Sequence, residues 1–180
     1  MSRIAKLLGL AMASLLACGV ADGQTKRPDF SGVWKLDMKA SEFGNIPGGR
    51  PTARVDSIDQ GPAFVWQVLY LDNGGKKDTT VYRYTTDGVE CVNRVAGSEI
   101  KSVVSWEGDS LRVESRTKLM VFDMTLSEVW RLSSDGRTLM MDRIVKYPLG
   151  KGKQALVFAK QASEETPAVV APARKAPPGN

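Results

Sequence analysis

Between Asp29 and Gln161 the chain is interrupted at short intervals by tight-turn sequences, and the segments between the turns alternate apolar and polar residues. Side chains repeat with a period of two along a β-strand, so this alternation predicts strands. The predicted turns are Asn73-Gly74-Gly75, Asp87-Gly88, Ala96-Gly97-Ser98, Gly108-Asp109, Asp135-Gly136 and Pro148-Leu149-Gly150. Such tight turns connect antiparallel neighbours. The sequence therefore predicts an all-β fold, a single antiparallel up-and-down β-barrel of about eight to ten strands.

The two ends of the 180-residue chain differ in composition from the part between them. The first segment starts with Arg3 and Lys6, continues as a short apolar run and ends in small residues, which is typical of a secretory signal rather than of a membrane span. The last segment is rich in Pro and Ala and holds too little apolar surface to offset the entropy of ordering it. The predicted organisation is a signal peptide at 1–23, a short tether at 24–28, the barrel at 29–161 and a disordered tail at 162–180.

Two processing routes fit the predicted signal, and both imply export. The stretch Leu15-Leu16-Ala17-Cys18-Gly19 resembles a bacterial lipobox, in which Cys18 would become the first residue and carry acyl chains. The alternative is cleavage after small residues further on, for instance after Gly23, which would remove Cys18. The expected location is accordingly the periplasm, the outer membrane through a lipid anchor at Cys18, or the outside of the cell.

Charge gives no indication of a nucleic-acid partner. The formal net charge is +5, and loss of Arg3 and Lys6 with the signal lowers it to +3. A nucleic-acid-binding surface needs clustered basic residues interleaved with exposed aromatic residues. Outside the two ends, the densest basic pair is Lys76-Lys77, which lies in a predicted turn. We therefore expect a solvated surface and no nucleic-acid partner.

The residue types that usually carry catalysis or bind metals are scarce. The chain has no His, which removes the commonest general base and the commonest metal ligand. With Cys18 acylated or removed, Cys91 has no partner for an intramolecular disulfide, and it is expected to be a small buried apolar residue. No Gly-flanked Ser and no acidic cluster with ligand spacing appears. We expect no enzymatic activity, no metal and no cofactor.

Centring a hairpin on each predicted turn brings apolar residues together on one face. The predicted cross-strand pairs are Trp106 with Leu111, Val104 with Val113 and Ser102 with Ser115; Tyr84 with Cys91 and Tyr82 with Asn93; and Leu132 with Leu139, Trp130 with Met141, Glu128 with Arg143 and Leu126 with Val145. Glu128 and Arg143 each lie between apolar neighbours on the same face, so they are predicted to form a buried cross-strand ion pair. Arg143 could then bind a ligand carboxylate while Glu128 orients it, or the two could satisfy each other inside a filled barrel.

Several polar residues fall on the same inward face, which favours a hollow interior. Asn93, Ser102 and Ser115, with the hydroxyl groups of Tyr82 and Tyr84, each need a partner, and a cavity with water or ligand supplies one. Apolar walls for a flat or flexible hydrophobic molecule would come from Trp66, Trp106, Trp130, Phe122, Met124 and Met141. The predicted ligand-binding residues are Trp66, Tyr82, Tyr84, Trp106, Met124, Glu128, Trp130, Met141 and Arg143. A packed core of the same residues is the alternative.

The start of the domain resembles a known family of barrels. Gly32-Val33-Trp34, within "FSGVWKLDMKASEFG", resembles the Gly-x-Trp motif that opens the first strand of lipocalins and related calycin barrels. Together with "YTTDGVECVNRVAGSEIKSVVSWEGDSLRVES", "EVWRLSSDGRTL" and "LVFAKQ", it looks like a group of uncharacterised exported bacterial lipocalin-like proteins over nearly all of the barrel region. The resemblance implies that Trp34 packs across the closed end of the barrel, with Lys160 as the nearest counterpart of the family's basic residue, which is usually Arg.

Two functions follow from these observations. The first is an exported lipocalin-like barrel that binds a small hydrophobic or amphipathic ligand in its interior and catalyses no reaction, as the resemblance implies. The alternative is an envelope-associated structural or protein-interaction module with a filled barrel, whose contact surface would include the loop from Gly44 to Pro51. An interior cavity of several hundred cubic ångströms would favour the first.

Overall fold

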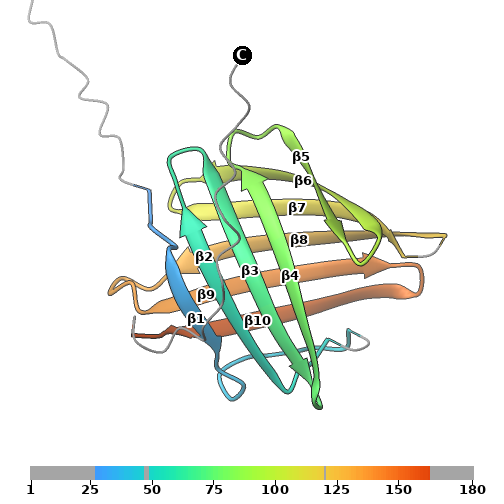
Figure 1. The fold of residues 1–180 in the computed structure, drawn as a ribbon, viewed down its shortest axis with the longest axis horizontal. Helices are drawn as coiled ribbons and strands as arrows, with labels where there is room; N and C mark the ends of the chain where they lie inside the picture. Colours follow the sequence, from blue (N-terminus) through green and yellow to red (C-terminus); the bar gives the residue numbers. More distant parts are fainter. Residues whose placement is uncertain (1–26, 47–48, 120, 163–180) are drawn as a thin grey trace, which may run out of the picture.

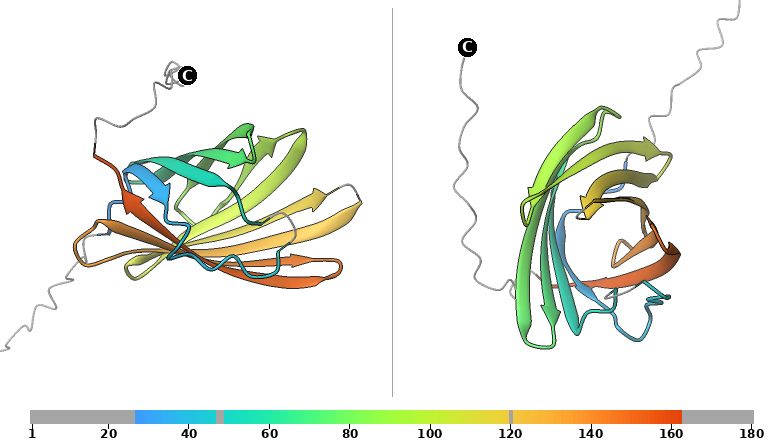
Figure 2. Two further views of the ribbon diagram at one scale, coloured as in Figure 1. Left: turned by 90° about the horizontal axis from the view of Figure 1, so that it is seen from below. Right: turned by 90° about the vertical axis from the view of Figure 1, so that its right-hand side faces the viewer.

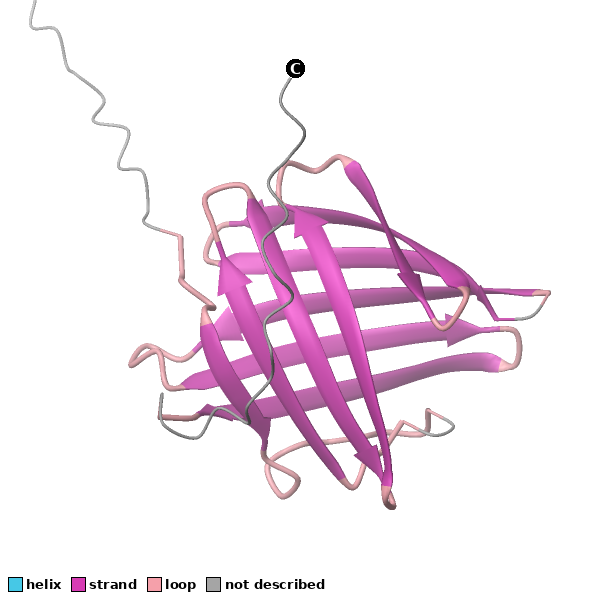
Figure 3. Cartoon of the chain, in the orientation of Figure 1, coloured by secondary structure: helices cyan, strands magenta, loops and turns pink. Residues whose placement is uncertain are grey.

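A computed structural model describes residues 27–46, 49–119 and 121–162, and within these ranges the chain forms strands and turns but no helix (Figures 1 and 3). The strands are β1 (Gly32–Leu36), β2 (Ala53–Gln60), β3 (Phe64–Asn73), β4 (Lys76–Thr85), β5 (Glu90–Val95), β6 (Ser98–Glu107), β7 (Ser110–Leu119), β8 (Phe122–Leu132), β9 (Thr138–Tyr147) and β10 (Gly150–Lys160). The predictions for the signal, for Cys18 and for the tail lie outside the described residues. Among the described residues, none belongs to a helix of membrane-spanning length and hydrophobicity.

The strands form one antiparallel sheet in the order β4-β3-β2-β1-β10-β9-β8-β7-β6-β5. Consecutive strands are paired neighbours except β4 and β5, which form the two edges of the sheet, and β1 also pairs with β10. Strands β2 to β4 run across β6 to β10 rather than along them (Figure 1), and the strands wrap around a common interior when seen from the side (Figure 2, right). The predicted all-β meander barrel is therefore confirmed, and it has ten strands.

The hairpin turns account for most of the residues with positive φ. Gly74 and Gly75 have φ values of 66° and 93° between the paired residues at the ends of β3 and β4. Ala96 and Gly97 occupy the equivalent positions between β5 and β6, with φ values of 48° and 81°. Positive φ at both central residues is the geometry that matches the twist of a two-residue hairpin. Ala96 is the one non-glycine residue in the described part of the chain that adopts it.

Two of the three predicted hairpin registers are confirmed. Trp106 pairs with Leu111 and Ser102 with Ser115 across β6 and β7, and Glu128 pairs with Arg143 across β8 and β9. The predicted pairs Tyr84 with Cys91 and Tyr82 with Asn93 were wrong, because no ladder joins β4 to β5 in the described residues. After the turn at Asp87-Gly88 the chain leaves β4, and β5 pairs with β6 alone.

The core lies at the end of the barrel where β1 begins. Its fully buried large side chains include Trp34, Trp130, Phe30 and Phe158. Trp34 donates its indole N–H to the carbonyl of Phe30 at 2.8 Å, and the ammonium of Lys160 lies 5.0 Å from the Trp34 ring centroid. Strand pairing places Lys160 directly opposite Trp34, as the resemblance to lipocalins implied. This end of the barrel is closed by side chains.

Candidate ligand site inside the barrel

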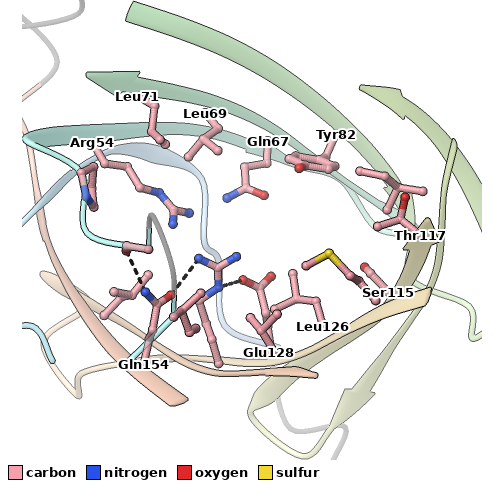
Figure 4. Close-up of a pocket in the computed structure, with 18 of the residues that line it drawn as sticks. Arg54, Gln67, Leu69, Leu71, Tyr82, Ser115, Thr117, Leu126, Glu128 and Gln154 are labelled. Carbon is pink, nitrogen blue, oxygen red and sulfur yellow. Dashed lines mark hydrogen bonds and ion pairs between the residues drawn. The ribbon is translucent and has the colours of Figure 1, made fainter. Parts of the chain in front are cut away.

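The interior of the barrel contains a cavity of about 390 Å³ that is partly open to solvent. Its apolar walls come from β1, β3, β6, β8, β9 and β10 and from the segment between β1 and β2. They comprise Leu36, Phe43, Ile46, Pro51, Leu69, Leu71, Ile100, Met124, Leu126, Val145 and Leu156. Polar side chains line the same space, and Figure 4 shows Arg54 and Gln67 on the wall opposite Glu128 and Gln154. The site is thus a largely apolar pocket with a few converging polar groups, as small-molecule sites usually are.

The segment between β1 and β2 covers one side of the cavity and is held against β10. Glu42 and Ala155 exchange two backbone hydrogen bonds of 2.8 and 2.9 Å. Gly152 allows the close approach of Ile46, because a Cβ atom at Gly152 would lie 2.2 Å from the Ile46 Cγ1 atom. The amide of Gln154 donates to the carbonyl of Gly49 at 2.8 Å. Residues of β10 therefore position the segment that supplies Phe43, Ile46 and Pro51 to the wall.

A first charged cluster is formed by Arg54 and Asp56, which face inward from β2. The Nε and Nη2 atoms of Arg54 each donate to one carboxylate oxygen of Asp56 at 2.8 Å. Gln67, on the neighbouring strand β3, donates to the same carboxylate at 2.7 Å. Asp56 is fully buried and Arg54 nearly so. A bidentate pair with a further amide donor is the arrangement that makes a buried ion pair tolerable.

A second charged cluster joins Glu128, Arg143 and Gln154 on the opposite wall. The Arg143 Nε atom lies 2.5 Å from the Glu128 Oε1 atom, as an ion pair rather than a well-aligned hydrogen bond. Arg143 also donates through Nη1 to the Gln154 side chain at 3.3 Å. Glu128 is buried, whereas the Arg143 side chain is 22% exposed, toward the cavity that it lines. The predicted ion pair is therefore present.

Burial and these ion pairs determine the protonation of the interior groups. Desolvation lowers the pKa of Arg54, but the attraction of Asp56, with a smaller contribution from Glu128, outweighs it and leaves the pKa above its usual value. Burial raises the pKa of Tyr84 well above its usual value, and the nearby Glu128 adds to the effect. Burial also raises the pKa of Tyr82, with Glu128 adding to the shift and Arg143 opposing it. At neutral pH the site therefore combines the charged guanidinium of Arg54 with the neutral phenols of Tyr82 and Tyr84.

Five of the nine predicted ligand-binding residues line the cavity, namely Tyr82, Tyr84, Met124, Glu128 and Arg143. Trp130 and Met141 point inward but are completely buried in the core beneath it. Trp106 lies in the closed end, where it stacks on Phe30 with ring centroids 5.9 Å apart. Their placement as walls of the cavity was wrong, because Trp130 and Met141 belong to the core and Trp106 packs against it.

Trp66 and Phe122 are also not part of the cavity wall. Trp66 is 39% exposed on the outer face of β3, beside Phe64 and under the guanidinium of Arg83. Gln67 takes the inward position next to it, since side chains alternate along the strand. Phe122 begins β8 and is 52% exposed. The placement of Trp66 on the inner face was therefore wrong, whereas Phe122 lies on the same face of β8 as Met124 but does not line the cavity.

Four charged and amide residues of the site were not predicted from the sequence, namely Arg54 and Asp56 on β2, Gln67 on β3 and Gln154 on β10. Arg54, Asp56 and Ile58 follow one another at intervals of two residues, so they share one face of β2. An Arg and an Asp on the same face as a buried Ile are a detectable signal of an inward ion pair. Their position across the cavity from Glu128 and Arg143 depends on closure of the barrel, and no pattern in a short stretch of sequence indicates it.

Other features of the described residues do not suggest a competing site. No group of three or more His, Cys, Asp or Glu side chains in the described ranges could hold a metal ion. A second depression of about 790 Å³ lies near the β5–β6 and β7–β8 turns, but it is more open and lined mainly by polar and charged residues such as Glu99, Lys101 and Arg116. The interior cavity is the better-formed pocket.

No protein-family profile matches the sequence, and no curated protein matches it. Solved structures match in fold. Zebrafish ileal bile acid-binding protein, complexed with cholic acid, is 18% identical with a TM-score of 0.54, covering 73% of this chain and 98% of its own. A secretory abundant heat soluble protein of Ramazzottius varieornatus is 12% identical with a TM-score of 0.55, covering 73% of this chain and 95% of its own.

The fold is that of the calycin-type β-barrels. Identities this low show the fold alone, so the similarity transfers no ligand and no site residue to this chain.

Proposed function

We propose that this protein is exported and binds a small hydrophobic or amphipathic molecule in the cavity of its barrel without catalysing a reaction on it. The observation that carries the proposal is the partly open cavity of about 390 Å³ with apolar walls and two polar clusters. Ligand pockets span roughly 300 to 1,000 Å³. The bile acid-binding neighbour, with cholic acid in its complex, supports this use of the fold. Export is supported by the signal-like residues 1–23.

The absence of His from the chain supports a binding role over a catalytic one. The buried carboxylates of Asp56 and Glu128 are both held by arginine side chains, so neither is placed as a free general base. The alternative of an envelope module with a filled barrel has less support, because leaving the cavity unfilled would forfeit packing contacts without a compensating role.

Native mass spectrometry of the protein purified from its own host tests the proposal. We expect a co-purifying small molecule that is released on denaturation. Leu126→Trp should fill part of the cavity and remove the adduct, because Leu126 points into it (Figure 4). Val129→Trp is the matched control, since Val129 is on the outer face of the same strand. Absence of any adduct, together with no thermal stabilisation by a panel of lipids, would contradict the proposal and favour the filled-barrel module.

A further inference from the structure

We infer that the barrel selects an amphiphile whose polar end is uncharged, such as a long-chain alcohol, ester or amide, over a carboxylate anion of the same length. This inference rests on the proposed function and adds the chemical class of the ligand. Its basis is that the charges in and just beneath the cavity wall are already paired. In the described residues these are two cations, Arg54 and Arg143, and two anions, Asp56 and Glu128.

The pair on β2 neutralises Arg54 and occupies the Nε–Nη2 edge of its guanidinium. Both oxygens of Asp56 are occupied by the two donors of Arg54 at 2.8 Å, and Gln67 adds a third donor. The Arg54 guanidinium also lies 5.1 Å from the Phe158 ring centroid, so an aromatic ring covers part of it. A ligand anion that approached the remaining Nη1 donors would lose its hydration and lie close to the buried negative charge of Asp56, which is unfavourable.

The pair on β8 and β9 excludes an anion in a similar way. Glu128 lies 2.5 Å from the Arg143 Nε atom, and Gln154 accepts from Nη1. An incoming carboxylate would lose its hydration and meet the negative charge of Glu128 beside the positive charge of Arg143. The attraction and the repulsion then largely cancel, and the desolvation of the ligand is not recovered.

An uncharged polar group of a ligand is not repelled by Glu128 in this way. A guanidinium carries five N–H donors, and Glu128 and Gln154 engage only part of those of Arg143. A hydroxyl or carbonyl oxygen can accept a further hydrogen bond from it, while the phenol groups of Tyr82 and Tyr84 line the same cavity. Arg50 is a further cation, stacked on the ring of the cavity-lining Phe43, but it is exposed and therefore screened by solvent.

Calorimetric titration with dodecan-1-ol and with dodecanoate at pH 8 compares the two classes at equal chain length. The carboxyl group is fully ionised there, since its ordinary pKa is about 4. We expect the alcohol to bind at least about tenfold more tightly, which corresponds to roughly 1.4 kcal/mol. Equal or tighter binding of dodecanoate would overturn the inference while leaving the proposed function intact. Failure of both ligands, and of the wider lipid panel, would contradict the proposed function itself.

The variant Glu128→Gln supplies the second arm of the test. It removes one interior negative charge at nearly constant shape and leaves Arg143 with an uncompensated charge, so dodecanoate should gain about tenfold in affinity while dodecan-1-ol changes little. Asp142→Asn is the matched control, because Asp142 is exposed on the outer face of β9, where it pairs with Arg131. It makes the same change in net charge and should leave both affinities unchanged. An unchanged preference in Glu128→Gln would show that charge pairing does not set the selectivity.

Discussion

The side-chain amide of Asn93 on β5 hydrogen-bonds to both backbone polar groups of Arg83 on β4. The Arg83 N–H donates to the Asn93 Oδ1 atom at 2.7 Å, and the Asn93 Nδ2 atom donates to the Arg83 carbonyl at 3.1 Å. No ladder joins these two strands in the described residues, so a side chain here takes the place of a backbone partner. The barrel is thereby held together at its one unpaired seam in the described sheet, between β4 and β5.

Replacement of Asn93 with alanine should destabilise the barrel, because the Arg83 N–H and carbonyl would lose their partner at a partly buried position. We expect a loss of about 1 to 3 kcal/mol in the free energy of unfolding, measured by urea denaturation. Arg94→Ala is the control on the same strand, since its side chain is 82% exposed and makes only a surface ion pair. A loss no larger than that of the control would show that the seam does not depend on this amide.

The ion pair of Arg54 and Asp56 should contribute strongly to the free energy of unfolding, and this contribution should depend on the presence of both side chains. Asp56→Asn leaves the buried Arg54 charge uncompensated, and we expect it to cost about 3 to 5 kcal/mol in unfolding free energy. The double variant Arg54→Met with Asp56→Leu should cost clearly less than the sum of the single changes. Asp59→Asn, at an exposed position of the same strand, should stay within about 0.5 kcal/mol of the parent. If the losses in unfolding free energy from the two single changes add up to the loss in the double variant, the two side chains are not energetically coupled.

Ala96 offers a route to greater stability, because its φ of 48° is uncommon for a residue with a Cβ atom. Asparagine is preferred at the first position of a hairpin turn followed by glycine. Ala96→Asn is therefore expected to raise the unfolding free energy by roughly 0.5 to 1 kcal/mol. Thermal denaturation monitored by circular dichroism measures the gain. Ala63→Asn is the control, because Ala63 lies in the β2–β3 turn and does not have a positive φ. It should not raise the unfolding free energy. A similar increase in this variant would show that the positive φ of Ala96 is not the reason for the stabilisation.

Alkaline pH should destabilise the protein through Tyr84. Its pKa in the folded state is raised well above 10.0, whereas an unfolded phenol titrates near 10.0. Above pH 10 the unfolded state therefore loses a proton that the folded state keeps. Stability is fully present below that pH and falls by up to about 1.4 kcal/mol per pH unit between the unfolded and the folded pKa.

Tyr84→Phe removes this proton and should make the decline in stability above pH 10 shallower, as measured by denaturation at a series of pH values. Tyr147→Phe, near the β9–β10 turn, serves as the control and should follow the parent protein. If the two variants decline equally steeply, Tyr84 is not the group responsible.

The residues that could be placed from the sequence are those whose position depends on a nearby turn. A hairpin register is fixed by a tight turn and by the demand that apolar residues share one face, so Glu128 could be paired with Arg143 from local information. The same reasoning failed for Tyr82 and Asn93. Their turn sequence is similar, but residues 86–89 form a wider connection after which β5 separates from β4, and neither strand carries a local signal of that separation.

The side of β3 that faces the interior could not be determined from the sequence of the strand itself. Its sequence, FVWQVLYLDN, is apolar on both faces, and the turn that precedes it at Gly61 was not recognised. Trp66 was therefore placed inside, although the structure puts Gln67 there, where it hydrogen-bonds to Asp56. A strand with two apolar faces is oriented by its partners across the sheet rather than by its own alternation.

The sequence by itself determined the strands, most of their turns and the ion pair of Glu128 with Arg143, because each of these depends on residues close together along the chain. Tertiary structure alone decided that β1 pairs with β10, that a cavity remains above the aromatic core, and that Arg54 and Asp56 lie across it from that ion pair. These depend on contacts between residues far apart in the chain. The curvature of the whole sheet brings such residues together, and no short segment encodes it.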